Sequence, residues 1–347
     1  MKKLHTAIVA SGVLLLAFLI YRIGPASLWQ NLALLGWGFL SLTLLDGMAE
    51  FFHTHAWRHC LSGPHRSLPF FRVFSIRLAG SSINHLTPFA GLGGEVTKGF
   101  LLASNETGPD AATAVIIDKL SVALAQLIFV VGGSLAVLWK IALPRGLWIA
   151  LISGTALLAA GVVGFLVVQK YGKLGAVVRW CVAHRVGGSG LERTARHMTH
   201  VDRALQSFYR TRPLDLPLAT FWHILGMVWS IIPAFYFLTL LTKGASLSVA
   251  AAIVCLGTWF NLVTFALPVD IGVQETTRLI IFRMLGFPSA LGLTYGIAIR
   301  LEQLFWAGVG LAVYAILVVK MRKRRIALTK EAGDKNPEKG EALWKRV

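Results

Sequence analysis

Long apolar runs alternate with short polar segments along this chain. Each of the longer runs could form a helix that approaches the ~30 Å hydrocarbon core of a bilayer, and they cover residues 6–23, 32–52, 111–138, 147–168, 216–241, 246–267 and 288–319. Two further runs, at 70–87 and 92–103, are shorter. This pattern predicts an all-α polytopic membrane protein with about eight membrane-embedded helices.

The composition supports this class of protein. Of the 347 residues, 55% are hydrophobic and only 14% are charged, and the mean hydropathy of +0.65 lies outside the range of soluble domains. The cysteines Cys60, Cys181 and Cys255 are scattered along the chain, which favours neither a disulfide framework nor a metal site.

The net charge of +18 is unevenly distributed along the chain. Lys and Arg gather between 170 and 212 and again after Lys320, whereas the turns at 140–145 and near Lys243 carry few. By the positive-inside rule, both termini and the 170–212 segment are expected on the cytoplasmic side of a bacterial inner membrane. Basic clusters beside membrane helices favour contact with anionic lipid headgroups, so nucleic acid is not an expected partner.

A short polar pattern occurs twice, at a separation of about 180 residues. The segment 88-PFAGLGGEVTK-98 matches 268-PVDIGVQETTR-278, so that both copies read P-x6-E-x2-[K/R]. Each copy follows an apolar segment and precedes a short amphipathic segment and a long apolar helix. Tracing the chain from a cytoplasmic start places the two copies in opposite orientations, an arrangement typical of secondary transporters.

We therefore predict two inverted repeats. The first covers residues 1–145, and the second covers 146–320 and includes a cytoplasmic linker at 170–212. The remaining residues, 321–347, are basic and polar, and we expect a disordered cytoplasmic tail there.

Each repeat is predicted to contain a re-entrant helical hairpin, at 70–103 and at 246–286. The second arm of the first hairpin, at 92–103, would rise only ~18 Å and could not cross a bilayer. The hairpin tips are expected at Pro88 and Gly91 and at Pro268 to Gly272, because proline ends a helix and glycine permits a tight reversal. Irregular backbone at membrane depth is tolerated only where it is buried in protein or lines a wet cavity.

Charged and polar residues near these tips form the predicted substrate site, because a charge inside a membrane is costly without a partner or water. The hairpin residues in this site are Gly93, Gly94, Glu95, Lys98, Asp270, Glu275 and Arg278, and the neighbouring ones are Asn84, Asp118, Lys119, Arg300 and Glu302. A helix N-terminus combined with Lys98 or Arg278 would suit a phosphate group. The simpler interpretation, also left open, is that Glu95 with Lys98 and Glu275 with Arg278 are i, i+3 pairs that lower their own cost.

A second group of polar residues lies in 46-DGMAEFFHTHAWRHC-60. Asp46, Glu50, His53 and Trp57 share one helical face, and we interpret them chiefly as a polar stripe facing the helix bundle. A membrane metalloenzyme using His53, His55 and His59 is a weaker alternative, since such enzymes need several histidine clusters around one metal. No hydrolase or nucleotide-binding motif is present in the sequence, so we expect neither enzymatic activity nor a cofactor.

These residues also carry a family resemblance. The chain resembles the transmembrane, flippase-like region of the lysylphosphatidylglycerol synthases over roughly residues 5–320. The resemblance is carried by Trp57-Arg58, the N-x3-P-x2-G-x2-G-E-x2-K run from Asn84 to Lys98, Asp118-Lys119, and the series Pro268, Gly272 and Glu275. It implies movement of a lipid between leaflets, with an anionic phospholipid, a hopanoid or a polyprenyl-linked precursor as cargo.

The chain departs from the full synthases in two respects. The sequence given ends at Val347, which leaves too little chain after Val319 for a soluble aminoacyl-transfer domain, so lipid aminoacylation is not expected. Lys119 stands where the family pattern has an arginine, which weakens the case for a bidentate contact there. The alternative to a transporter is a non-transporting membrane scaffold for a lipid or glycan biosynthetic enzyme. Such a scaffold would not need charges around a hydrated cavity.

Overall fold

The computed structural model describes residues 21, 25–86, 92–103, 108–140, 145–171, 180, 202–264 and 272–335. These residues contain helices and no strand, which confirms the predicted all-α class. The helices are α2 (Pro25–Leu35), α3 (Gly38–Cys60), η1 (Gly63–Ser67), α4 (Phe70–Leu86), α5 (Leu92–Leu102), α6 (Gly108–Lys140), α7 (Arg145–Lys170), α10 (Asp215–Trp229), α11 (Ile231–Leu241), α12 (Leu247–Thr264), α13 (Val273–Met284) and α14 (Ser289–Lys335). Residues 202–211 form a further short helix.

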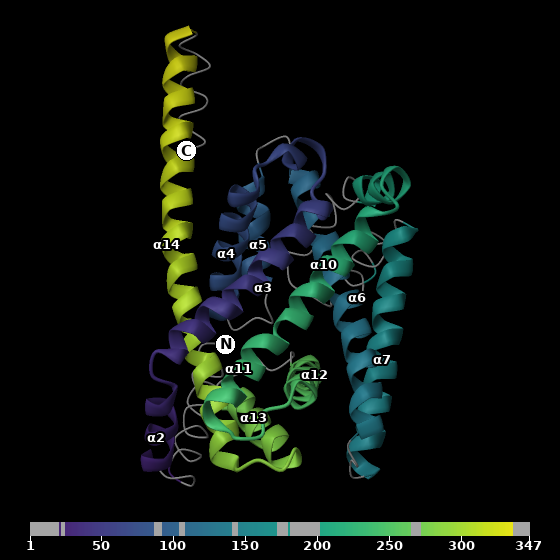
Figure 1. Cartoon of the computed structure of the whole chain (residues 1–347). Helices are drawn as coiled ribbons and strands as arrows, with labels where there is room; N and C mark the ends of the chain where they lie inside the picture. Colours follow the sequence, from purple (N-terminus) through teal and green to yellow (C-terminus); the bar gives the residue numbers. More distant parts are fainter. Residues whose placement is uncertain are drawn as a thin grey trace.

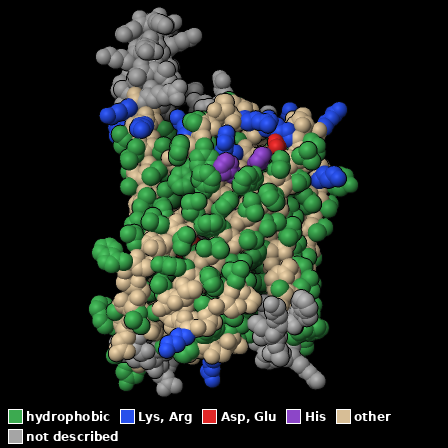
Figure 2. Space-filling view, viewed as in Figure 1, with side chains coloured by type: hydrophobic (Ala, Val, Ile, Leu, Met, Phe, Trp, Pro, Cys, Tyr) green, Lys and Arg blue, Asp and Glu red, His purple; other side chains and the backbone are tan. Residues whose placement is uncertain are grey.

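Several helices have the length and apolar composition needed to cross a membrane. Within the described residues these are Asp110–Ala136, Asp215–Leu241 and Ser289–Lys323, with Trp29–Leu35 and Gly38–Cys60 as a fourth span if that bent pair counts as one. Figure 2 shows a broad band of hydrophobic side chains across the visible face of the molecule, with Lys and Arg near its upper and lower edges. The protein is therefore a multi-pass membrane protein, while the count of about eight embedded helices stays a prediction.

The apolar run at 32–52 does not form one continuous helix. The chain bends by 72° between α2 and α3, and Gly36 at the bend has a φ of +42°, a left-handed conformation that glycine adopts without steric cost. Hydrophobicity alone gave no sign of this break, because the residues on both sides of Gly36 are apolar.

Two pairs of helices match the arms of the predicted hairpins. α4 packs against α5, and α12 packs against α13. In Figure 1, α4 and α5 lie in the upper part of the molecule, whereas α13 lies at its lower end. The connecting segments 87–91 and 265–271 lie outside the described residues, and so do the predicted tip residues Pro88, Gly91 and Pro268 and the site residue Asp270.

The helices that follow these two helix pairs pack across the molecule. α6 follows the α4–α5 pair and packs on α12, while α14 follows the α12–α13 pair and packs along α4 (Figure 1). Each long helix thus contacts the first arm of the other pair. α3 packs along α10, which connects the two parts of the chain through a third contact.

Two predicted segments differ from the structure or are only partly described. The tail expected to be disordered from residue 321 continues α14 as helix to Lys335, because its Lys, Arg, Ala, Leu and Glu residues are good helix formers. Most of the 170–212 linker lies outside the described residues. Its final part, 202–211, is helical and buries Leu205 and Phe208 among the residues of α3, α4 and α6.

Candidate functional site

A buried network of charged residues surrounds Lys98 on α5. The Lys98 Nζ atom lies 2.7 Å from Glu95 Oε2 and 2.7 Å from Asp118 Oδ2, and it sits 5.1 Å from the centre of the Trp57 ring. Lys98 is 4% exposed and Asp118 is 1% exposed. The predicted i, i+3 pair of Glu95 and Lys98 is therefore present, and α6 adds a second carboxylate to it.

The network extends to three more charged side chains. Arg77 Nε lies 2.9 Å from Glu50 Oε2, and Arg77 Nη1 lies 3.7 Å from Asp118 Oδ2. At the other end, Lys119 Nζ lies 2.9 Å from Glu95 Oε1 with its side chain 46% exposed. We call this network the Lys98 cluster, and its charges balance because it consists of the acids Glu50, Glu95 and Asp118 and the bases Arg77, Lys98 and Lys119.

Close packing of α5 on α4 positions this cluster. Gly94 lies within α5, where a β-carbon would collide with the backbone oxygen of Gly80 and the side chain of Asn84. The Gly94 N–H donates to Asn84 Oδ1 over 2.6 Å. Gly93 and Gly94, which the sequence analysis listed in the substrate site, both belong to the first turn of α5. Gly94 permits close contact between α4 and α5, and the Asn84 side chain accepts a hydrogen bond from the backbone of α5.

The second copy of the pattern uses its carboxylate differently. Gly272 precedes α13 with a φ of +79°, and its N–H donates to Glu275 Oε2 over 2.8 Å. The other carboxylate oxygen, Glu275 Oε1, accepts a hydrogen bond from Arg300 Nε over 2.9 Å. The ion-pair partner of Glu275 is therefore Arg300 and not Arg278, which the sequence analysis had considered for this pair. It lies 25 positions after Glu275, nearly the same spacing as Lys119 after Glu95.

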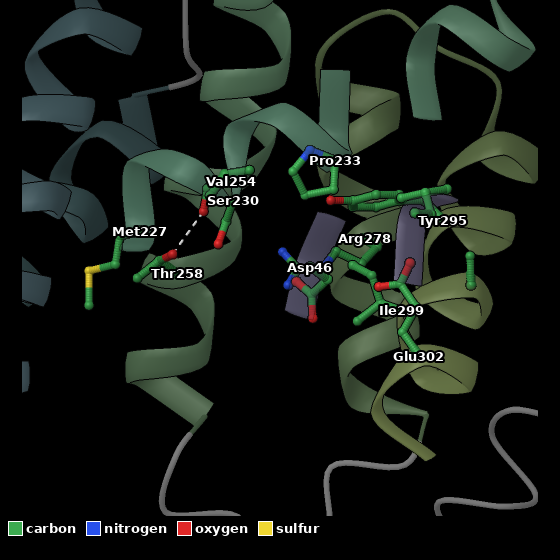
Figure 3. Close-up of a pocket in the computed structure, with 12 residues that line it drawn as sticks. Asp46, Met227, Ser230, Pro233, Val254, Thr258, Arg278, Tyr295, Ile299 and Glu302 are labelled. Atoms are coloured by element: carbon green, nitrogen blue, oxygen red, sulfur yellow. Dashed lines mark hydrogen bonds between the residues drawn. The ribbon is translucent and has the colours of Figure 1, made fainter. Parts of the chain in front are cut away.

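Arg278 instead lines a cavity with a volume of about 190 Å³. We call it the Arg278 cavity. The residues lining it come from α3, α10–α14 and the α10–α11 junction, and they are Leu42, Asp46, Met227, Ser230, Pro233, Val254, Thr258, Arg278, Tyr295, Ala298, Ile299 and Glu302. Figure 3 shows Asp46, Arg278, Tyr295, Ile299 and Glu302 close together on one side of it. The space is sufficient for several water molecules or a small charged group.

The charges of the Arg278 cavity are less well satisfied than those of the Lys98 cluster. Glu302 is 4% exposed, its Oε1 atom has no hydrogen-bond partner in the part of the chain that the structure describes, and no described cation forms an ion pair with it. Glu95 Oε2 of the Lys98 cluster also lacks a hydrogen bond of good geometry, but the Lys98 Nζ atom lies 2.7 Å from it as an ion-pair partner. The Arg278 guanidinium packs on α12 at Gly257, in the space that a β-carbon on that residue would occupy. No described carboxylate forms an ion pair with Arg278. A buried, unpaired carboxylate beside a cationic wall is well suited to bind a polar ligand or water.

The structure brings the described site residues together in three groups. Glu95, Lys98, Asp118 and Lys119 meet in the Lys98 cluster, with Asn84 beside it. Arg278 and Glu302 meet in the cavity, while Glu275 and Arg300 pair at the start of α13.

The sequence analysis missed two cluster contacts, those of Arg77 and His223. His223 Nε2 lies 3.2 Å from Asp118 Oδ1. Both residues stand inside apolar runs that were predicted to be membrane-embedded. A charged or titratable residue in such a run is a functional candidate by default, and this signal could have identified both.

The histidines of α3 contact different neighbours. His53 contacts His223, His55 stacks on Trp222, and His59 lies 3.5 Å from Asp215. Among the described residues, no group of three His, Cys, Asp or Glu side chains is placed to hold a metal ion. The interpretation of Asp46, Glu50, His53 and Trp57 as a stripe facing the bundle agrees with their contacts.

Comparison with known proteins gives one match. The profile of the lysylphosphatidylglycerol synthase TM region matches residues 4–312, which is nearly the whole chain. No curated protein and no solved structure gives a significant match. The match agrees with the resemblance carried by the Asn84 to Lys98 run, whose described residues form the α4–α5 pair and part of the Lys98 cluster. This multi-pass protein belongs to the lysylphosphatidylglycerol synthase TM region family.

Proposed function

We propose that the protein moves a phospholipid or a lipid-linked precursor between the two leaflets of a bacterial inner membrane. The observation that carries this proposal is the Arg278 cavity, which places a guanidinium and two carboxylates, Asp46 and Glu302, between α3, α13 and α14. Charges among spanning helices are costly unless they face a partner, water or a ligand. A lipid headgroup crossing the bilayer is a ligand that requires such a place.

The packing of the helices supports two inverted halves. α6 contacts α12, and α14 contacts α4, so each half sends its long helix to the first hairpin arm of the other. The Glu95–Lys119 and Glu275–Arg300 ion pairs occupy matching positions in the two halves. Such reciprocal contacts between the halves are expected when two repeats of opposite orientation enclose a site near the middle of the membrane, as in many secondary transporters.

The distribution of charge supports an orientation. Lys and Arg are more frequent along the upper edge of the view in Figure 2 than along the lower edge. Arg58, Arg66 and Arg72 are exposed around the α3–α4 connection. Under the positive-inside rule this connection faces the cytoplasm. The α4–α5 hairpin would then enter from the cytoplasm, and the α12–α13 hairpin from the opposite side.

The alternative of a membrane scaffold for a biosynthetic enzyme explains less of the structure. A scaffold gains nothing from Glu302, whose buried carboxylate oxygen has no described partner and therefore lowers stability. A transporter uses the same atom to receive a headgroup or its water. The cavity charges therefore favour transport, and enzymatic activity is not part of the proposal.

Leaflet exchange of fluorescent phospholipids in proteoliposomes tests the proposal. The protein is expected to accelerate exchange, and Arg278→Gln and Glu302→Gln are each expected to slow it about tenfold or more, since a charge-assisted hydrogen bond contributes ~1.5–3 kcal/mol. Leu304→Ala is the matched control, because Leu304 is an exposed residue of the same helix as Glu302.

Two outcomes would count against the proposal. Equal exchange rates in liposomes with and without the folded protein, for zwitterionic, anionic and polyprenyl-linked lipids alike, would reject transport. Wild-type exchange in both cavity variants, with the variants folded, would remove the Arg278 cavity from the mechanism.

A further inference from the structure

Two buried histidines meet where α3 packs along α10. The Nδ1 atoms of His53 and His223 lie 2.8 Å apart, and their ring centroids lie 5.0 Å apart. Gly226, on the same face of α10 as His223, has no side chain, and a β-carbon there would lie 2.8 Å from His53 Cε1. The small residue therefore leaves room on α10 for the His53 ring.

The contacts determine which ring nitrogens carry hydrogen. The Asp118 carboxylate can only accept, so His223 donates from Nε2 over 3.2 Å to Asp118 Oδ1. A neutral His223 then has an acceptor at Nδ1, and His53 donates to it from its own Nδ1. The remaining ring nitrogen of His53, Nε2, is consequently the one that can accept a further proton.

This chain of hydrogen bonds continues into the Lys98 cluster. The other oxygen of Asp118, Oδ2, contacts Lys98 Nζ at 2.7 Å and Arg77 Nη1 at 3.7 Å. The charged and titratable groups around the histidine pair therefore come from α3 (Glu50), α4 (Arg77), α5 (Lys98 and Glu95) and α6 (Asp118). The cluster is neutral overall when both histidines are neutral, so one added proton leaves an excess positive charge in a buried place.

We propose that His53, His223 and Asp118 form a proton relay that couples movement of an anionic lipid to movement of a proton. In the uptake step, a proton from water binds His53 Nε2, and the proton on His53 Nδ1 moves to Nδ1 of His223. The resulting His223 imidazolium lies beside the Asp118 carboxylate. Release reverses these transfers, so no other reactant is consumed.

The position of the relay relates proton binding to lipid binding. His53 belongs to α3 and His223 to α10, so the proton is shared between the two halves that enclose the site in the proposed function. The imidazolium also neutralises Asp118, which weakens its attraction for Lys98. An excess positive charge favours a bound anion, so proton and anionic headgroup are expected to travel together. This inference rests on the proposed function.

The first test measures exchange of fluorescent phosphatidylglycerol and phosphatidylcholine in proteoliposomes between about pH 8 and about pH 5, the range around imidazole titration. Wild-type exchange of phosphatidylglycerol is expected to rise several-fold as the pH falls and to be accompanied by proton uptake that a pH-sensitive dye reports. Phosphatidylcholine should respond less. His223→Gln and His53→Gln are expected to abolish the pH dependence.

Two further variants separate the relay from structural effects. Gly226→Ala is expected to displace the His53 ring and shift the pH profile, because its β-carbon takes the space of that ring. His55→Gln should keep the wild-type profile, since His55 lies on the same helix as His53 but contacts the rings of Trp222 and Phe70 and does not join the relay.

The failure of the relay and the failure of transport give different results. Exchange that occurs at one rate across the pH range, in wild type and His223→Gln alike, overturns the relay and leaves transport intact. If no lipid is exchanged, transport is rejected, and NMR titration of labelled histidines in the purified protein still tests the relay. Identical titration of His53 in wild type and His223→Gln would then overturn it.

Discussion

The Lys98 cluster and the Arg278 cavity occupy corresponding places in the two copies of one sequence pattern, yet their charges are satisfied very differently. Lys98 has two carboxylate oxygens at 2.7 Å and an indole ring beside it, and all of these groups are buried. Arg278 faces a cavity of about 190 Å³ that also contains the unpartnered Glu302 oxygen. Similar residues are therefore paired in the Lys98 cluster but face open space in the Arg278 cavity, where the proposed function uses them to bind a headgroup.

The largest effect is expected from Asp118→Asn. This change removes the negative charge that Lys98, Arg77 and His223 share, and breaking a buried ion pair in this way costs about 3–5 kcal/mol. Thermal unfolding in detergent should show a large loss of stability. Asp46→Asn, in the Arg278 cavity, is the matched control and should change stability little. Equal small effects would mean that the Lys98 cluster is as hydrated as the cavity.

A smaller loss is expected from Gly94→Ala, which tests the packing that holds the cluster. The new methyl group would collide with the Gly80 carbonyl oxygen and Asn84, and overpacking of this kind costs about 1–3 kcal/mol. Gly161→Ala in α7 meets no atom within 4 Å, so it should be neutral or slightly stabilising. Unfolding midpoints of the two variants should differ accordingly, and identical midpoints would contradict close contact of α4 and α5.

Glu302→Gln should leave stability unchanged or raise it by about 1 kcal/mol. A neutral amide is less costly to bury than a carboxylate whose Oε1 atom has no described partner. The same variant is expected to lose leaflet exchange, so stability and function would change in opposite directions. A clear loss of stability would show that Glu302 is a paired structural residue, as Glu95 is.

The smallest effect is expected from Lys119→Met. Its side chain is 46% exposed, and ion pairs at such positions contribute less than about 1 kcal/mol. Lys98 is buried and contacts the other oxygen of the Glu95 carboxylate, so Lys98→Met should lower the stability several times more. Stability that falls equally in both variants would contradict the burial difference between the two lysines.

The sequence predicted the local features of this molecule better than its long-range contacts. The bounds of α4, α5, α12 and α13 were close to those expected, because proline and glycine interrupt the apolar runs at Pro88 and Pro268. The Glu95–Lys98 pair was foreseeable because both residues lie on one helix at i, i+3 spacing. Gly36 was not recognised as a break, since apolar residues continue on both sides of it.

The remaining contacts depend on how distant helices pack. Glu275 could have paired with Arg278 on its own helix, but the position of α14 offers Arg300 instead. The pairing of His53 with His223 joins α3 to α10 across 170 positions of the sequence, and no spacing rule relates them. Arg77 and His223 could have been suspected as isolated polar groups in apolar runs, but their partners could not have been named.

α14 has a mechanical consequence for any motion of the protein. It is a single helix from Ser289 to Lys335, and it touches α13 near its start and α4 farther along (Figure 1). A continuous helix that packs on α13 of one helix pair and on α4 of the other would transmit a tilt of one pair to the other. In the proposed transport, such coupling would open the site to one side of the membrane while closing it to the other.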